Sequence, residues 1–162
     1  MRSAYVLVSI GKQAGHGTDI VAVGYVDDAL NVAQQNSERL DLTNRARFEP
    51  SDWFSAVTGQ FDLIVSNPPY IAADEMPGLA PEVQNYEPRM ALTDEGDGLG
   101  AYRTIMAEID DHLCAGGCVM VEIGPTQAEE VTKLMQQANL QDVEVRSDLD
   151  GRDRVVIGNK AP

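Results

Sequence analysis

The chain has 162 residues, of which 43% are hydrophobic, and it contains no apolar run of membrane-spanning length. These values predict a single soluble globular domain over residues 1–162 that does not insert into a membrane. Acidic residues number 26 against 12 basic ones, which gives a formal charge of −14. Because duplex DNA is bound mainly through Lys and Arg contacts with phosphates, this charge disfavours direct binding of nucleic acid.

Residues 5–10 and 19–23 are short apolar runs rich in β-branched residues, and they predict two strands. A short Gly-rich stretch separates them and leaves too little chain for the helix of a parallel crossover. We therefore expect the first helix to be absent, so that residues 1–19 form a divergent or shortened first strand and loop. If the two runs pair, the short link favours an antiparallel hairpin.

A helix and two strands are predicted next. Asp27 or Asp28 can cap a helix that runs to about residue 40. Residues 46–49 predict a brief strand, and the apolar run 61–66 predicts a buried one. The absence of the first helix would leave a sheet face uncovered, and such an apolar patch invites self-association.

The segment from Ile71 to Gly98 is long, irregular and acidic. A loop of this length inside a compact domain is more often functional than decorative. From Leu99 to Leu113, apolar residues recur at helical spacing and predict a helix that is ended by Ala115-Gly116-Gly117.

The last third of the chain continues the alternation. Cys118 to Ile123 predicts a buried strand, and a helix is expected to begin at Thr126. Two final strands are predicted over 142–146 and 154–157. Because the link between them has no room for a crossover helix, this pair must be antiparallel.

The two cysteines, Cys114 and Cys118, flank Ala-Gly-Gly. Their spacing fits no common zinc site, and the chain offers only His16 and His112 to complete one. We therefore expect no metal site and two free thiols, as is typical of the reducing cytoplasm.

The stretch Asn67-Pro68-Pro69-Tyr70 follows the buried strand, where open α/β sheets bind their ligands. Each proline fixes φ and lacks an N–H, so the local carbonyls stay free to accept hydrogen bonds. The Asn67 side-chain oxygen and the Pro68 carbonyl would accept the two hydrogens of a planar NH₂ group, and Tyr70 would offer it a flat face. Such a cradle orients a conjugated nitrogen for methyl transfer without a covalent intermediate. The alternative is a plain turn that ends the strand.

The element order and several motifs resemble the Rossmann-like class I methyltransferases that use S-adenosylmethionine, and within them the HemK-type protein-glutamine methyltransferases. The resemblance extends from about Ile20 to the end of the chain and is carried by Ser51-Asp-Trp-Phe54, Asp62-Leu-Ile-Val-Ser-Asn-Pro-Pro-Tyr-Ile71, Tyr86-Glu-Pro-Arg-Met-Ala-Leu92, Val121-Glu-Ile-Gly124 and Arg152-Asp-Arg-Val155. It implies a mostly parallel α/β sheet with a C-terminal antiparallel hairpin. It also implies methylation, with S-adenosylmethionine as cofactor, of the glutamine amide in the Gly-Gly-Gln motif of peptide-chain release factors, a role in translation termination.

Carried over to this sequence, the resemblance implies that the stretch from Asn67 to Tyr70 holds the substrate amide, with Asn67 also near the methyl donor. Trp53 would lie beside the adenine ring, with Asp52 next to it. Trp53 could instead be a core residue, and Asp52 could cap a turn. The Glu87 and Arg89 side chains either order the long loop over the substrate or pair with each other at the surface.

Two cofactor-binding positions depart from the family pattern. Where the family has an acidic, Gly-rich loop that cradles the methionine part of the cofactor, this chain has Gly11, Gly15 and Gly17 with different spacing and no acidic residue. Where the family has an acidic residue for the ribose hydroxyls, this chain has Gly24. Nothing in the sequence corresponds to the N-terminal helical domain of the family.

These departures leave two alternatives to the full enzyme. The first is a truncated or vestigial copy that keeps the amide pocket but binds the cofactor poorly. The second is an adenine or small-amine N-methylase, because such enzymes share the Asn-Pro-Pro-Tyr motif.

Overall fold

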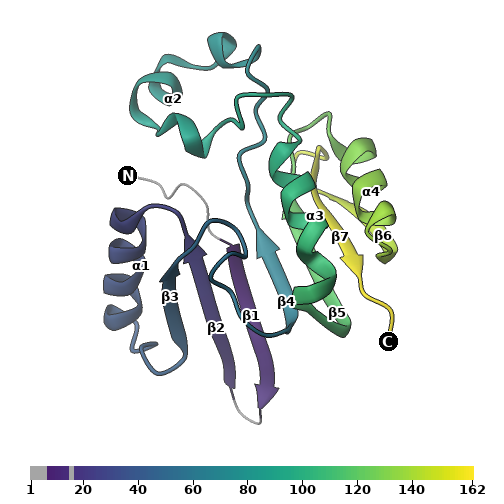
Figure 1. Cartoon of the computed structure of the whole chain (residues 1–162). Coiled ribbons are helices and arrows are strands. Elements are labelled where there is room, and N and C mark those ends of the chain that lie inside the picture. Colours follow the sequence, from purple (N-terminus) through teal and green to yellow (C-terminus); the bar gives the residue numbers. More distant parts are fainter. Residues whose placement is uncertain (1–6, 15–16) are drawn as a thin grey trace.

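The computed structural model describes residues 7–14 and 17–162, and Figure 1 shows their arrangement. The strands are β1 (Leu7–Ala14), β2 (Gly17–Gly24), β3 (Ala46–Pro50), β4 (Phe61–Ser66), β5 (Leu113–Glu122), β6 (Gln141–Ser147) and β7 (Asp153–Asn159). The α-helices are α1 (Asp27–Arg39), α2 (Pro81–Tyr86), α3 (Gly100–His112) and α4 (Ala128–Gln137). The strands form one sheet in the order β3-β2-β1-β4-β5-β7-β6.

Most strands of this sheet run in one direction. β2 pairs with β3 in parallel and β4 with β5 in parallel, whereas β1 is antiparallel to both β2 and β4. β7 is antiparallel to both β5 and β6. Five strands therefore share a direction, and β1 and β7 are reversed. The predicted α/β class with a C-terminal antiparallel hairpin is confirmed.

The reversal of β1 follows from the length of its link to β2. β1 ends at Ala14 and β2 begins at Gly17, and these two residues pair across a hairpin. A link of this length admits only an antiparallel partner, as the sequence predicts. As a consequence, β1 and β2 are joined at the end of the sheet opposite to the end at which β2, β3, β4 and β5 finish.

The core lies between the middle of the sheet and α3. Helix α3 buries Ala101, Tyr102, Ile105, Met106 and Ile109, which is the helical spacing that the sequence predicts. All of these side chains except that of Ala101 join buried residues of β4 and β5 in one hydrophobic cluster. Burial of each large aliphatic side chain stabilises the fold by about 1.5–3 kcal/mol relative to exposure, so this cluster fixes the strand ends that carry the site.

Three predicted element boundaries are wrong. Helix α1 begins directly at Asp27, and its N-cap is Val26 with no side-chain cap, so Asp27 and Asp28 lie in the first turn, where the helix dipole favours a negative charge. Helix α3 passes at His112 straight into β5, so residues 115–117 lie inside the strand as a bulge. Helix α4 begins at Ala128 rather than Thr126.

The segment predicted as an irregular loop contains α2 and two short 3₁₀ turns. Its two ends lie together, because the N–H of Ile71 donates to the carbonyl of Leu92 at 2.9 Å and that of Ala73 to Gly96 at 2.9 Å. The segment is therefore a closed surface loop whose shape is set by its ends. Figure 1 shows it above the carboxyl ends of the central strands.

Both cysteines are free thiols, as predicted. Within residues 7–14 and 17–162, no group of acidic, His or Cys side chains is placed to hold a metal ion. Among the helices described in this range, none has the length and apolar character needed to cross a membrane.

Candidate functional site

The predicted cradle lies where β4 ends, at the edge of a cavity of about 320 Å³. Pro68 and Pro69 are buried, whereas Asn67 is exposed and lines the cavity. No hydrogen bond to the Asn67 side chain is formed within the part of the chain that the structure describes. The carboxamide is thus held by a rigid, buried base and is open to a ligand. The cavity is lined by Asn67, Pro68, Tyr70, Ile71, Val83, Glu87, Ala91, Leu92 and Glu122.

Tyr70 is fixed at both its ends. Its hydroxyl donates to Oε1 of Glu122 at 3.3 Å, and its carbonyl accepts from Nε2 of Gln127 at 2.8 Å. Burial raises the pKa of the Tyr70 phenol, and the nearby Glu122 carboxylate raises it further while Arg154 opposes the shift. The phenol is therefore neutral at physiological pH and acts as a donor to Glu122.

The Gln127 side chain joins the cradle to three other segments. Its Nε2 also donates to the carbonyl of Gly98 at 3.2 Å, and its Oε1 accepts from the N–H of Gly124 at 3.0 Å and from the hydroxyl of Tyr102 at 3.3 Å. Both amide hydrogens are therefore used, and the side-chain oxygen accepts from Gly124 and shares the hydroxyl hydrogen of Tyr102 with the carbonyl of Glu122. Gln127 therefore ties both ends of the 71–98 loop to the end of β5.

The far end of this loop is held by a carboxylate. Asp94 accepts backbone N–H bonds from Gly96, Gly98 and Gly100 at 2.9, 3.0 and 2.6 Å. Gly98 has φ of +75°, and a Cβ atom at this position would lie 2.4 Å from the carbonyl oxygen of Tyr70. The loop and the cradle thus meet backbone to backbone at a site that only glycine accommodates.

A second cavity, of about 220 Å³, lies beside the ends of β2 and β3 and is lined by Tyr25, Ser51, Asp52, Trp53 and Met90. Ser51 forms the turn there: its hydroxyl donates to the carbonyl of Trp53 at 2.8 Å and accepts the N–H of Ala56 at 3.0 Å. Trp53 packs partly against the core and also lines the cavity. The role of turn cap considered for Asp52 belongs to Ser51, and the Asp52 side chain is exposed.

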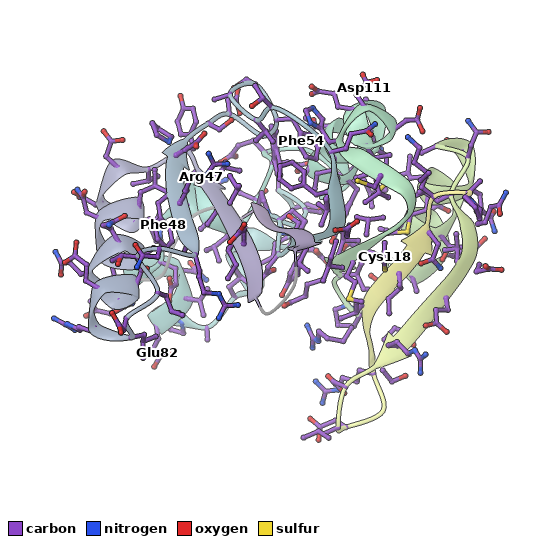
Figure 2. The ribbon with its side chains drawn as sticks, turned by 90° about the horizontal axis from the view of Figure 1, so that it is seen from below. Arg47, Phe48, Phe54, Glu82, Asp111 and Cys118 are labelled. Carbon is purple, nitrogen blue, oxygen red and sulfur yellow. The ribbon has the colours of Figure 1, made fainter. Side chains whose placement is uncertain are left out.

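The connector after this turn is anchored in the core. The ring of Phe54 stacks on that of His112 with centroids 4.4 Å apart and an interplanar angle of 7°. Figure 2, which views the molecule from below, shows Phe54 near Asp111 at the end of α3. The Trp53 turn is therefore rigidly attached to the helix that packs on β5.

The two glycines proposed for cofactor binding have different places. Gly24 is buried, and its carbonyl accepts the N–H of Ser51 at 3.0 Å, so it adjoins the second cavity. Gly11 lies in β1 beyond the Ile10–Leu63 pair, four residues after Leu7, which pairs with Ser66. At about 3.3 Å per residue, Gly11 lies about 13 Å from the end of the sheet that carries the cradle. The structure does not bring Gly11 to this end. Gly15 lies outside the described residues.

The second cavity fits the nucleoside part of S-adenosylmethionine. Trp53 and Tyr25 offer flat faces for a base, and the exposed carboxylate of Asp52 offers acceptors for amine and hydroxyl hydrogens. Within residues 7–14 and 17–162, no Gly-rich loop for the methionine part lies at this end of the sheet, because β1 and β2 are joined at the opposite end. The residues present thus fit one half of the cofactor.

The side chains of Glu87 and Arg89 do not pair with each other. Arg89 instead donates from Nε and Nη2 to the two carboxylate oxygens of Glu95, at 2.5 and 2.8 Å. This pair is exposed and contributes little stability, so its effect is local to the loop. Glu87 lines the cavity beside the cradle.

Sequence reasoning missed four residues that shape the cradle: Asp94, Gly98, Glu122 and Gln127. Glu122 lies inside a motif already noted, Val121-Glu-Ile-Gly124. A charged residue at the end of an apolar strand is a signal for a side chain that faces a site there. Asp94 is followed by glycines at spacings of two, which is typical of a carboxylate that collects backbone N–H groups. No local pattern marks Gln127 or the close approach at Gly98.

Comparison with known proteins identifies the family of this chain. A family model described as the methyltransferase small domain matches residues 5–97. Two similar curated relatives, from Cereibacter sphaeroides and Caulobacter vibrioides, are each named release factor glutamine methyltransferase. The first is 48% identical over 145 residues, which cover 90% of this chain and 51% of the relative. The second is 44% identical over 136 residues, which cover 83% and 47%.

The chain therefore spans about half the length of these curated relatives. Among solved structures, a methyltransferase from Pyrococcus furiosus matches with a TM-score of 0.66 at 18% identity, over 99% of this chain and 77% of that chain. A likeness at this identity shows a shared fold, in agreement with the α/β sheet described above.

Proposed function

Because this chain belongs to the methyltransferase small domain family, we propose that it methylates the glutamine side-chain amide in the Gly-Gly-Gln motif of peptide-chain release factors. S-adenosylmethionine is the proposed methyl donor, and the cytoplasm, where translation terminates, is the proposed site of action. Residues 1–162 are proposed to act as one domain. The observation that carries the proposal is the Asn67 carboxamide, open to a cavity on a base of two buried prolines.

In the proposed reaction, each residue of the cradle has a separate task. Asn67 accepts one hydrogen of the substrate amide through Oδ1, and the carbonyl of Pro68 accepts the other. Tyr70 bounds the amide plane, with its ring held by the bonds at its hydroxyl and carbonyl. Pro69 keeps the turn rigid. When bound, S-adenosylmethionine supplies an electrophilic methyl group. Orientation of the nitrogen lone pair then provides most of the rate gain.

The nucleoside part of the cofactor is proposed to bind in the second cavity, beside Trp53, Asp52 and Gly24. Gly11 is left out of this proposal because it lies far from that end of the sheet. The negative charge of the chain favours a protein substrate over a nucleic acid.

Binding of the cofactor can be followed through Trp53, since the chain has a single tryptophan. Titration with S-adenosylmethionine is expected to quench the tryptophan emission, because the base would stack on the indole. Trp53→Leu is expected to weaken the calorimetric affinity by about 1–3 kcal/mol, the range for a base stacked on an aromatic ring. The matched control is Tyr86→Leu, which removes an exposed aromatic ring of α2. Equal affinities for the two variants would contradict the assignment of this cavity.

The reaction itself is tested with radiolabelled S-adenosylmethionine and a purified release factor. Label is expected in the release factor and is expected to be lost when the glutamine of its Gly-Gly-Gln motif is replaced by alanine. Transfer of label to the altered release factor at the original rate would overturn the proposed substrate.

A second candidate function is a binding module that keeps the amide pocket but holds the cofactor weakly. The reversed β1 favours it, because this strand carries Gly11 away from the cradle. Calorimetry separates the two candidates. An enzyme is expected to release or absorb heat on mixing with micromolar to low-millimolar S-adenosylmethionine, whereas the module is expected to give no heat with cofactor but to bind a Gly-Gly-Gln peptide.

A further inference from the structure

The phenol of Tyr70 is the last group in a series of side-chain contacts that begins in the last β-hairpin. We propose that Glu122 is a positioning residue for the substrate amide, which acts by holding the ring of Tyr70 in place and is itself held by Arg154 and Asp148. This inference rests on the proposed function, because it assigns Tyr70 to the amide cradle. It adds to the site a group that lies 52 residues from Tyr70 along the chain.

This series of contacts is continuous. The Tyr70 hydroxyl donates to Oε1 of Glu122 at 3.3 Å, and Nη1 of Arg154 lies 3.9 Å from the same oxygen. Nη2 of Arg154 donates to Oδ2 of Asp148 at 3.3 Å. Asp148 is anchored in turn, because its Oδ1 accepts the N–H groups of Asp150 and Arg152 at 2.9 and 3.0 Å.

The strand pairing explains why these groups meet. Glu122 is the last residue of β5, and it pairs with Val155 of β7, next to Arg154. The carbonyl of Glu122 also accepts the hydroxyl of Tyr102 at 2.8 Å, which fixes its backbone. The carboxylate is therefore presented at a fixed place at the end of the sheet, facing the cradle.

The side chains of Glu122, Arg154 and Asp148 are partly buried. The side chains of Arg154 and Glu122 are 30% and 33% exposed, and that of Asp148 is 24% exposed. A carboxylate accepts hydrogen bonds, so the hydroxyl hydrogen of Tyr70 points toward Glu122. Because Gln127 holds the carbonyl of Tyr70, the bond to Glu122 fixes the hydroxyl end of the same residue and therefore the position of its ring.

A competing interpretation is that Glu122 contacts the substrate directly, because it lines the same cavity. The two interpretations differ in one respect. A residue that acts through Tyr70 loses its effect when the Tyr70 hydroxyl is absent, whereas a direct contact keeps its effect. A double-mutant cycle measures this difference.

The cycle uses Glu122→Leu, Tyr70→Phe and the double variant, with kcat and KM measured on a release factor. Each single variant is expected to lower kcat/KM about tenfold, the size of one hydrogen bond to a charged group, with most of the loss in kcat. The double variant is expected to be no worse than Tyr70→Phe. Glu122→Gln keeps an acceptor and is expected to recover most of the activity. Glu144→Gln, the control, removes an exposed carboxylate that also pairs with an arginine and is expected to match the parent.

Two kinetic outcomes overturn the inference. One is a loss for Glu122→Leu that is as large in the Tyr70→Phe background as in the parent. The other is parental activity for Glu122→Leu. A parent protein that transfers no methyl group contradicts the proposed function instead, and a readout independent of activity then tests the positioning contact.

That readout is the titration of Tyr70, followed by NMR of ring-labelled tyrosine and assigned with Tyr70→Phe. The groups around the phenol are Glu122 of β5, Arg154 of β7 and Tyr102 of α3. Burial raises the pKa of Tyr70 and the Glu122 carboxylate raises it further, so Glu122→Gln is expected to lower it. Glu144→Gln is expected to leave it unchanged. An unchanged pKa in Glu122→Gln would mean that the contact is absent in solution, and the inference would fail.

Discussion

Replacement of Asn67 by alanine is expected to lower kcat/KM for methyl transfer by about 100-fold or more, with the fold unchanged. The substitution removes one of the two acceptors that orient the substrate amide, and loss of one preorganised polar group in an active site typically costs about 10²–10³ in rate. Stability is expected to change by no more than about 0.5 kcal/mol, because Asn67 is exposed and its side chain forms no hydrogen bond within the described residues. Initial rates with a release factor and a chemical denaturation curve measure both effects.

Two further variants make this result specific. Asn44→Ala applies the same substitution to an exposed asparagine between α1 and β3 and is expected to behave like the parent. Asn67→Asp keeps side-chain oxygens as acceptors and is expected to retain more activity than Asn67→Ala. If Asn67→Ala methylates a release factor at the parental rate, the cradle does not orient the substrate amide.

The placement of the cradle could be predicted because its determinants are local. The apolar run 61–66 and the Asn-Pro that follows it mark a buried strand and its end, and β4 has these bounds. The reversed first strand was predictable from the shortness of the link between β1 and β2, and the final hairpin from the link before β7. In each case, a few adjacent residues restrict what the backbone can do.

The supports of the cradle could not be predicted because their partners are distant in the sequence. Gln127 reaches Tyr70 across 57 residues and Gly98 across 29. Such contacts depend on how β5, α4 and the loop end meet in space, which hydrophobic periodicity does not report. The glycines at 116 and 117 show how a local pattern can mislead. They have the composition of a helix stop, yet β5 pairs with β4 on both sides of them, and they form part of a bulge.

The close approach at Gly98 gives the largest expected effect on stability. Gly98→Ala is expected to lower the free energy of unfolding by about 2–5 kcal/mol, from about 1–2 kcal/mol for a side chain at positive φ and about 1–3 kcal/mol for overpacking. The steric part arises because a Cβ atom would lie 2.4 Å from the carbonyl oxygen of Tyr70 and 3.0 Å from Nε2 of Gln127. Backbone must then move, and the cradle moves with it. We therefore expect kcat/KM to fall even at temperatures where the variant is fully folded.

Gly59→Ala is the control that separates the backbone strain from the steric part of this effect. Gly59 has φ of +92°, and a Cβ atom there would meet nothing within 4 Å, so the control carries the backbone strain without the collision. It is expected to cost about 1–2 kcal/mol and to leave kcat/KM at the parental value. The difference between the two variants in urea denaturation measures the contact between the loop and the cradle. Equal losses of stability, with full activity in both, would mean that the 71–98 loop does not press on Tyr70 and that the cradle is held by Gln127 and Glu122 alone.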